Sequence, residues 1–336
     1  MTTDRLDTIT VPPGDAGMRL DRWFRARFPH VTQGHLQKML RSGQVRVDAK
    51  RAPANTRLEA GNEIRVPRHV RTPQSDQDPR PRVQAPLGMS KADRDTIERM
   101  ILFEDGDILV LNKPQGLAVQ GGSGTRKHID GMLAGMTDRF GDRPRLVHRL
   151  DRDTTGVLLV AKSRIVAAAL GKEFQSRAAA KTYWALVKGV PRPSQGKVTA
   201  ALVKDSGPDG DRVRKAEPGE QAKAMHATTH YNVLDNAAQK AAWVSLKPTT
   251  GRQHQLRAHM AILGHPIVGD NKYEGGLDLP AENMSSRLHL HARRLKVPHP
   301  SARGVIDVSA PVPPHMMESM RLLGFDPNRF DDDDEA

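Results

Sequence analysis

The stretch HRLDRDTTGVLLVAKS, residues 148–163, constrains the fold more than any other part of the sequence. Val157 to Ala161 form an apolar run that indicates a buried strand. His148 to Gly156, directly before it, form the densest polar cluster in an otherwise apolar neighbourhood. A turn accounts for this composition, because Asp and Thr side chains satisfy backbone amides and Gly156 permits unusual backbone angles. Turn chemistry alone leaves open whether the loop also carries a function.

Strand-like runs continue on both sides of this stretch. They alternate with turns and read ILVLNKP (108–114), KTYWALVKG (181–189), HATTHYNVL (226–234) and AAWVSLKP (241–248). Helical spacing of apolar residues appears between them, at 165–177 and 253–263. The order of these segments predicts an α+β class with a mixed, mostly antiparallel sheet. Residues 205–220, rich in Gly, Pro and charge, are expected to form an exposed excursion between two strands.

The N-terminal part predicts a small α+β module with two helices and a strand. The apolar positions at helical spacing are Leu20, Trp23, Phe24 and Phe28 in the first helix and Leu36, Met39 and Leu40 in the second. Thr32 is a candidate N-cap of the second helix, and Gly43 is placed to end it. Residues 44–48 then alternate like a strand.

The domain boundaries follow from composition. Four prolines, at 73, 79, 81 and 86, lie among charged and polar residues and predict a partly extended linker. We therefore expect an N-terminal module over 16–67, a linker over 68–95 and a larger domain over 96–326. The acidic end of the chain, 327–336, is expected to be a solvated tail.

The net charge favours nucleic acid as the partner. Lysine and arginine number 52 against 39 aspartates and glutamates, which gives a formal charge of +13. Such an excess attracts phosphate, although it also fits anionic membranes or acidic proteins. No stretch approaches the roughly 20 apolar residues of a membrane span, and Met1 to Pro13 lacks the apolar core of a signal peptide. We therefore expect a soluble cytoplasmic protein with no membrane partner.

Metal chemistry finds little support. The absence of cysteine excludes disulfides, thiolate nucleophiles and cysteine-ligated zinc. The polar loop imitates the start of an EF-hand, but Lys162 replaces the bidentate glutamate expected at the twelfth position. His254 and His259 are five apart, whereas a helical zinc pair needs a separation of four with a glutamate between. His289 and His291 are only two apart, so we expect no metal.

HRLDRDTTGVLLVAKS closely resembles the signature of the RluA family of pseudouridine synthases. Further segments of that family occur in the expected order, as NKPQGLAV (112–119), KTY (181–183), TGRQHQLRAH (250–259), GHPIVGD (264–270) with Tyr273, and RLHLHA (287–292). The resemblance spans about residues 97 to 323, and it departs from the family at Gln253, where threonine or lysine is more frequent. Residues 18–67 resemble the alpha-L RNA-binding module shared by a small-subunit ribosomal protein and tyrosyl-tRNA synthetases.

The family resemblance implies conversion of uridine to pseudouridine in a central RNA cleft. The uracil is detached, turned over and rejoined to the same ribose through carbon, so no cofactor is required. By resemblance, Asp151 is the catalytic carboxylate, acting on the ribose as nucleophile or base. Arg257 is the arginine that pairs with it and keeps it ionised. We expect Asp153, in the same turn, only to satisfy backbone amides, and Lys113 to shape the sheet edge beside the cleft.

The remaining site residues would hold the RNA. By resemblance, Tyr183 packs on the target base, where its hydroxyl can assist the final proton removal, and Leu256 supplies an apolar wall. Arg149 resembles the residue that enters the space left by the flipped base. We also count His148 among the substrate-binding residues. On the N-terminal helices, the cations expected to meet the phosphate backbone are Arg19, Arg22, Lys38 and Arg41.

The leading hypothesis is a monomeric enzyme that acts on large-subunit ribosomal RNA or on an assembling ribosomal subunit. The alternative is a non-catalytic RNA-binding or ribosome-assembly protein. It is disfavoured because Asp151, Tyr183 and Arg257 are all intact. A DNA-binding role finds little support without a recognisable helix motif for reading a groove.

Overall fold

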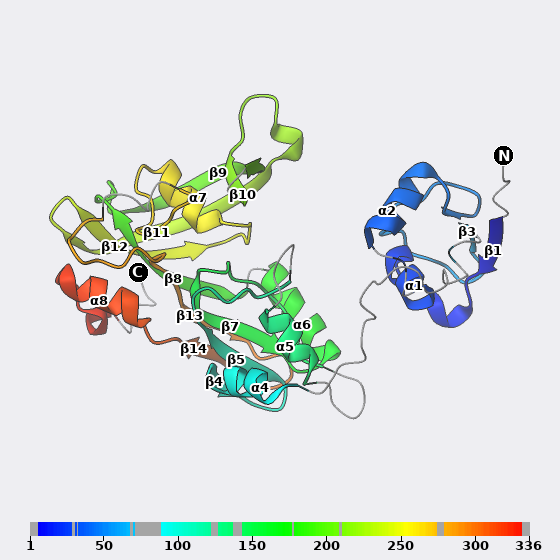
Figure 1. The fold of residues 1–336 in the computed structure, drawn as a ribbon, viewed down its shortest axis with the longest axis horizontal. Helices are drawn as coiled ribbons and strands as arrows, with labels where there is room; N and C mark the ends of the chain where they lie inside the picture. The colour runs from blue at the N-terminus through cyan, green and yellow to red at the C-terminus, as the bar shows by residue number, and fades with distance from the viewer. Residues whose placement is uncertain are drawn as a thin grey trace. The chain divides into compact units, whose positions relative to one another are not determined.

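The computed structural model describes residues 6–28, 31, 33–67, 70, 89–121, 127–136, 143–176, 178–207, 210–273 and 279–330. The chain divides into two compact units, Met1–Gln84 and Ala85–Ala336 (Figure 1). Each unit has hydrophobic clusters of its own. No helix among the described residues is long and apolar enough to cross a membrane.

The first unit combines a small antiparallel sheet with two helices. The sheet has the order β1-β3-β2, and its elements are β1 (Leu6–Thr10), β2 (Arg46–Val47) and β3 (Glu63–Pro67), with a 3-10 turn η1 (Pro13–Asp15) and helices α1 (Leu20–Arg27) and α2 (Gln33–Ser42). Both predicted helices are confirmed, since Trp23, Phe24, Leu36 and Met39 are buried in one core. Gly43 has φ +73° and follows α2, as predicted. Thr32 lies outside the described residues.

Strand β1 was missed by the sequence prediction, which began the module at residue 16. It pairs with β3 from Leu6 opposite Pro67 to Thr10 opposite Glu63. Ile9 packs against the core that Val11 enters. The segment LDTIT does not alternate apolar and polar residues regularly, so the period of a half-buried strand could not be seen.

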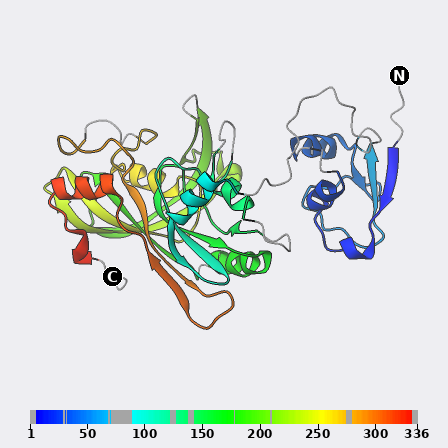
Figure 2. The same ribbon diagram turned by 60° about the horizontal axis from the view of Figure 1, so that its bottom comes forward.

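The second unit is built on an 11-stranded sheet of order β10-β9-β11-β12-β8-β13-β7-β5-β4, with β14 on β13 and β6 on β7 (Figures 1 and 2). All its pairs are antiparallel except β13 with β7. This confirms the predicted class. Its strands are β4 (Ile101–Glu104), β5 (Ile108–Lys113), β6 (Arg145–Leu146), β7 (Thr155–Ala161), β8 (Ala180–Lys188), β9 (Gln195–Gly207), β10 (Gly210–Lys215), β11 (Met225–Ala237), β12 (Ala241–Pro248), β13 (Leu290–Pro298) and β14 (Val305–Ser309).

Helices cover both faces of the central strands. They are α4 (Lys91–Glu98), α5 (Ile129–Ala134), α6 (Arg164–Ser176), α7 (Gln255–Ile262) and α8 (Pro314–Leu322), with 3-10 turns η2 (Gln221–Lys223) and η3 (Pro327–Phe330). In β7, Leu158 and Val160 enter the cluster that contains α4, α5 and α7. Val157 and Leu159 enter the cluster on the other face, with α6. Burial on both faces explains why β7 is an unbroken apolar run.

Three predicted boundaries were wrong. Residues 205–220 are not a mere excursion, because they contain the end of β9 and all of β10 (Gly210–Lys215), which pair as a hairpin. Helix α4 begins at Lys91, inside the expected linker, and Ile97 anchors it in the core. The expected tail includes η3, where Phe330 packs edge-on against Trp243 with ring centroids 5.1 Å apart. Residues 331–336 lie outside the described residues.

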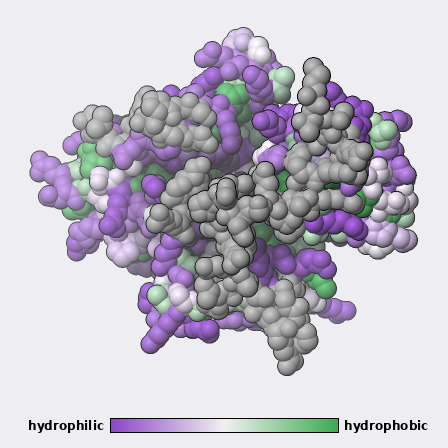
Figure 3. Space-filling model, turned by 45° about the vertical axis from the view of Figure 1, so that its right-hand side comes forward, coloured by the Kyte–Doolittle hydropathy of each residue, from purple (hydrophilic) through white to green (hydrophobic). Residues whose placement is uncertain are grey.

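The surface in view in Figure 3 is mostly hydrophilic, with small separate hydrophobic patches. The large exposed hydrophobic side chains of the described residues are spread over six elements, β4, α6, β11, α7, β14 and α8. Scattered apolar residues of this kind are ordinary on a folded surface and do not mark a binding face.

Candidate active site

The loop that carries Asp151 is fastened to the chain after β5. The backbone amide of Thr154 donates to the carbonyl of Asp151 at 3.2 Å, which closes a turn. The carbonyl of Arg152 accepts from Lys113 Nζ at 2.7 Å and from the amide of Gly116 at 3.0 Å. Lys113 is fully buried and also donates to the carbonyls of Pro114 and Leu117. Burial lowers the pKa of Lys113 to about 7, while the charges of Asp153 and Asp151 act in the opposite direction.

Gly156 lets the end of this loop enter the sheet. Its φ is +105°, and a Cβ there would lie 2.2 Å from the carbonyl oxygen of Ala292. The close approach is the parallel pairing of β7 with β13, which places Gly156 opposite Ala292 and Thr155 opposite His291. Thr155 Oγ1 lies 2.8 Å from His291 Nδ1 inside the protein. Only glycine fits this backbone, so the loop enters β7 at a fixed angle.

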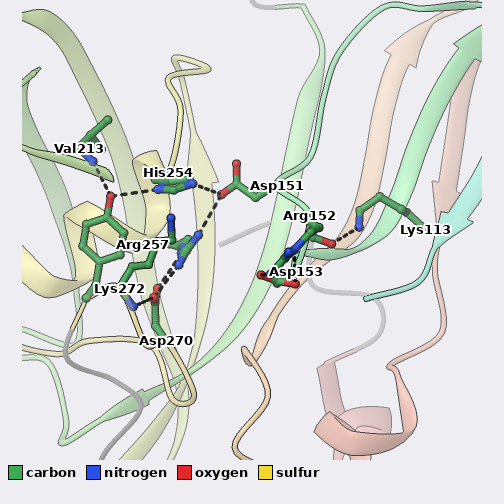
Figure 4. Close-up of polar contacts among 10 residues, drawn as sticks. Lys113, Asp151, Arg152, Asp153, Val213, His254, Arg257, Asp270 and Lys272 are labelled. Atoms are coloured by element: carbon green, nitrogen blue, oxygen red, sulfur yellow. Dashed lines mark hydrogen bonds and ion pairs between the residues drawn. The ribbon is translucent and has the colours of Figure 1, made fainter. Parts of the chain in front are cut away.

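The structure brings Arg257 to Asp151, as the family resemblance implied (Figure 4). Arg257 Nη1 lies 3.7 Å from Asp151 Oδ2, and His254 Nε2 lies 4.0 Å from the same oxygen. The side chain of Asp151 is 26% exposed, whereas that of Arg257 is only 7% exposed. The carboxylate therefore meets solvent while its cationic partner is shielded by protein.

Arg257 is itself held by a second carboxylate that the sequence analysis did not assign. Its Nε donates to Asp270 Oδ2 and its Nη2 to Asp270 Oδ1, each at 2.7 Å. The amide of Lys272 donates to Asp270 Oδ1 at 3.0 Å, and the Tyr273 ring centroid lies 5.2 Å from Arg257 Cζ. Burial opposes the charge on Arg257, but the hydrogen bonds and charge of Asp270 outweigh it and raise the pKa of Arg257.

His254 is the second functional candidate that sequence reasoning missed. It precedes α7 with φ +50°, a left-handed conformation that is uncommon outside glycine. Its Nδ1 lies 3.2 Å from the Tyr273 hydroxyl, which accepts from the amide of Val213 at 2.8 Å. In the sequence, His254 lies within the family segment TGRQHQLRAH, but the resemblance assigns it no role, and its five-residue spacing to His259 argues only against zinc.

The histidines that were weighed as zinc ligands have separate hydrogen-bond partners. His259 Nδ1 lies 2.9 Å from Thr229 Oγ1, and His289 Nε2 lies 2.7 Å from Ser319 Oγ. In the part of the chain that the structure describes, no three His, Asp or Glu side chains group as metal ligands would.

Tyr183 and Leu256 lie in one hydrophobic cluster with Leu150, the neighbour of Asp151. Burial raises the pKa of Tyr183, and the negative charge of Asp151 raises it further. Among the described residues the Tyr183 hydroxyl has no hydrogen-bond partner. The Tyr183 ring is thus close enough to the carboxylate to feel its charge, and Leu256 belongs to the same hydrophobic cluster.

Three predictions about the loop side chains fare differently. His148 is turned inward, where its Nε2 accepts from the amide of Leu159 at 2.9 Å and its ring stacks on Phe174, so this placement does not support a substrate-binding role. Arg149 is exposed and donates to Gln120 Oε1 at 3.2 Å. Asp153 does not satisfy backbone amides as expected, because its carboxylate accepts from the guanidinium of Arg152.

The basic residues predicted on the N-terminal helices are on the surface of the first unit. Arg22, Lys38 and Arg41 are exposed. Arg19 instead forms a two-point ion pair with Asp21, with Nη2 to Oδ2 at 2.7 Å. That pair neutralises Arg19 locally, so it is the least available of the four for a phosphate.

A fixed carboxylate beside an aromatic ring and an aliphatic wall suits an enzyme that acts on a nucleoside. Residues 107–262 match the model of the family described as RNA pseudouridylate synthase. The chain is 35% identical over 335 residues to ribosomal large subunit pseudouridine synthase C of Escherichia coli (strain K12), covering 96% of this chain and 98% of that protein. It is 34% identical over 320 residues to the protein of that name in Pasteurella multocida (strain Pm70), covering 94% and 93%.

A solved structure agrees with these matches. The structure of Human RNA Pseudouridylate Synthase Domain Containing 4 aligns with a TM-score of 0.56 and 30% identity, over 68% of this chain and 95% of that chain. The protein therefore belongs to the RluA family of RNA pseudouridine synthases, and it is an isomerase that converts uridine to pseudouridine in RNA.

Proposed function

We propose that this protein modifies uridines of large-subunit ribosomal RNA, with Asp151 as its catalytic carboxylate. The assignment of Asp151 rests on its contact with Arg257, whose guanidinium also donates two hydrogen bonds to the buried Asp270. The choice of RNA is supported by the relatives, which are named as ribosomal large subunit pseudouridine synthases. A monomer working in the cytoplasm, where ribosomes are assembled, is part of this proposal.

The reaction needs an ionised carboxylate and little else. The bond between N1 of uracil and C1′ of ribose breaks, the ring turns, and C5 bonds to C1′. C5 then loses its proton and N1 gains one, so atoms and electrons balance without a second substrate. Asp151 either attacks C1′ as a nucleophile or removes a proton from the ribose as a base. Both roles require the anion, which the positive charge of Arg257 favours.

Tyr183 and Leu256 suit the handling of a flipped base. A uridine in stacked RNA must leave the stack to reach a carboxylate beside the protein core, and it then needs new stacking partners. Tyr183 supplies a ring, and Leu256 supplies an aliphatic surface in the same cluster. A tyrosine hydroxyl keeps its proton at neutral pH, and burial raises the pKa of Tyr183 further. It is therefore better suited to donating a hydrogen bond to uracil than to acting as a free base.

The first unit would supply affinity for the RNA backbone. Arg22, Lys38 and Arg41 are exposed on its two helices, where their charges can meet phosphates. Arg149, exposed on the loop before Asp151, would fill the gap left by the flipped base. Contacts of these cations with phosphates or stacked bases give affinity, whereas selection of the target uridine requires base-specific contacts.

The proposal is tested by mapping pseudouridines in total RNA from cells with and without the gene. We expect one or more sites in large-subunit rRNA to lose the modification in the deletion strain, and purified protein to restore them in rRNA from that strain. An unchanged map would contradict the choice of RNA. Tight binding to the rRNA without conversion would instead favour the non-catalytic alternative.

A further inference from the structure

Both polar contacts of the Asp151 carboxylate go to one of its two oxygens. Arg257 Nη1 and His254 Nε2 lie 3.7 and 4.0 Å from Oδ2. Among the described residues, Oδ1 has no polar contact. Figure 4 shows one oxygen directed at His254 and Arg257 and the other directed away from both. The two oxygens are therefore not equivalent, and one of them is free to meet a substrate.

The hydrogen bonds of Tyr273 favour one tautomer of His254. The Tyr273 hydroxyl accepts from the amide of Val213, so its single proton is available to His254 Nδ1 at 3.2 Å. With Nδ1 accepting, the proton of a neutral imidazole lies on Nε2 and points at Asp151. The opposite tautomer would turn the lone pair of Nε2 toward the negative Oδ2, which is unfavourable. Val213, Tyr273 and His254 thus form a chain that delivers an N–H to the carboxylate.

His254 is suited to orient this carboxylate without neutralising it. Burial lowers the pKa of His254, and the positive charges of Arg257 and Lys272 also lower it, against the opposite effect of Asp151 and Asp270. The ring therefore stays neutral near pH 7 and carries one N–H. Among the described residues, Arg257 is therefore the only one that places a positive charge in contact with Asp151.

The backbone of His254 supports a role for its ring. A φ of +50° costs more conformational energy for histidine than for glycine or asparagine. Its side chain is nevertheless only 10% exposed and engaged at both ring nitrogens. Strain of this kind persists where the surrounding structure holds the residue in place, and it concentrates at functional sites.

We propose that His254 is a positioning residue for Asp151. Its Nε2–H, set by Tyr273, and the guanidinium of Arg257 together hold Oδ2, and they leave Oδ1 as the oxygen that faces the ribose. The distance of 4.0 Å is longer than a hydrogen bond, and the proposal requires it to shorten in the complex with RNA. This inference rests on the proposed role of Asp151 and deepens it.

The test compares two substitutions of His254 in the full-length protein. His254→Leu removes the donor, whereas His254→Gln keeps an N–H close to the position of Nε2. Single-turnover conversion of large-subunit rRNA from the deletion strain should fall about 100-fold in His254→Leu and less than about fivefold in His254→Gln. The Kd for the same RNA should change less than about twofold in both, because the loss is in orientation and not in binding.

His259→Leu is the matched control. It removes a buried imidazole from α7, the helix that His254 precedes, but this imidazole contacts Thr229 instead of Asp151. We expect its rate constant to stay within about threefold of the wild type. Tyr273→Phe keeps the ring, removes the hydroxyl that sets the tautomer, and should lower the rate about tenfold even if His254→Leu fails to fold.

Several outcomes overturn the inference while leaving the function intact. Full activity of folded His254→Leu, equal losses in the Leu and Gln variants, or an equal loss in His259→Leu would each do so. Asp151→Asn is run in parallel to separate the two claims. An active wild type with an inactive Asp151→Asn upholds the function whatever His254 does, whereas a wild type that makes no pseudouridine overturns the function itself.

Discussion

Arg257 donates to both carboxylate oxygens of Asp270 at 2.7 Å, and the same guanidinium lies 3.7 Å from Asp151. One arginine therefore joins a fully buried carboxylate to a partly exposed one. Asp270 fixes the position of the charge, and Asp151 meets the substrate. Arg257 already forms its two-point hydrogen-bonded pair with Asp270. It can therefore place a positive charge beside Asp151 without also forming a two-point pair with Asp151.

Asp270→Asn should destabilise the second unit by about 3 kcal/mol, because it leaves the buried Arg257 with an incomplete partner. The measurement is urea unfolding at neutral pH. Asp307→Asn is the control, since Asp307 forms the same two-point pair with Arg294 at 2.6 and 2.7 Å, but with both side chains partly exposed. It should cost less than about 1 kcal/mol. Equal effects of the two substitutions would show that burial of the Asp270 pair is unimportant.

Gly156→Ala should destabilise the protein by about 3 kcal/mol and lower its activity, because the new Cβ would meet Ala292 in a left-handed backbone. The control is Gly171→Ala in α6, where a Cβ has nothing within 4 Å. A helical glycine of this kind should gain about 0.5–1 kcal/mol on replacement by alanine. Thermal unfolding of both variants decides the matter, and a Gly156→Ala protein as stable as the wild type would contradict the fit described for β7 and β13.

Stability should fall between about pH 6.5 and pH 4. Burial lowers the pKa of His259, His289 and His291 to about 4, against 6.5 for an ordinary histidine. Between these two pH values the three histidines take up protons in the unfolded chain but not in the folded chain. The free energy of unfolding therefore has its full value above the unfolded pKa and decreases as the pH falls. Urea unfolding at a series of pH values measures the slope. His230→Gln, which removes an exposed histidine, should leave the slope unchanged, and a flat profile in the wild type would contradict the burial of these rings.

Removal of residues 1–84 should leave the second unit folded, because its hydrophobic clusters are built from its own residues. RNA binding should weaken, and the logarithm of the binding constant should depend less steeply on the logarithm of the salt concentration. Filter binding at several salt concentrations tests this, with unfolding curves as the check on folding. Identical affinity and salt dependence in the truncated protein would show that the first unit does not contact RNA.

The sequence predicted five of the strands of the second unit, β5, β7, β8, β11 and β12, because each is a marked apolar or alternating run. It did not predict β4, β6, β9, β10, β13 or β14. Runs such as GVLLVAKS are apolar on both faces, and the structure buries β7 between two clusters. Helices α1, α2 and α7 were visible for a similar reason, since each has apolar residues at helical spacing. Periodicity fails where a strand is short or polar, as in β1 and β10. The pairing of β1 depends on β3, which is distant in the chain, whereas β10 pairs with the adjacent β9 but is rich in charged residues.

The site was predictable only as far as the family motifs reached. Asp151 and Arg257 lie far apart in the sequence, and the structure brings them together. Asp270, Tyr273 and His254 lie within the family segments, but their roles could not be predicted, because they act through tertiary contacts that the sequence does not show. His148 shows the converse, since its place within a polar motif suggested the substrate while packing turns it toward Phe174.

The central claim is that Asp151, and no other carboxylate of its loop, carries the chemistry. Asp151→Asn keeps the shape but loses the charge, whereas Asp153→Asn changes only a residue that pairs with the exposed Arg152. The most direct measurement is single-turnover pseudouridine formation in large-subunit rRNA, detected by mass, with RNA binding measured separately for each variant. We expect Asp151→Asn to bind normally and to lose at least about 1000-fold in rate, and Asp153→Asn to stay within about tenfold of the wild type. An active Asp151→Asn protein, or an inactive Asp153→Asn beside it, would contradict the assignment.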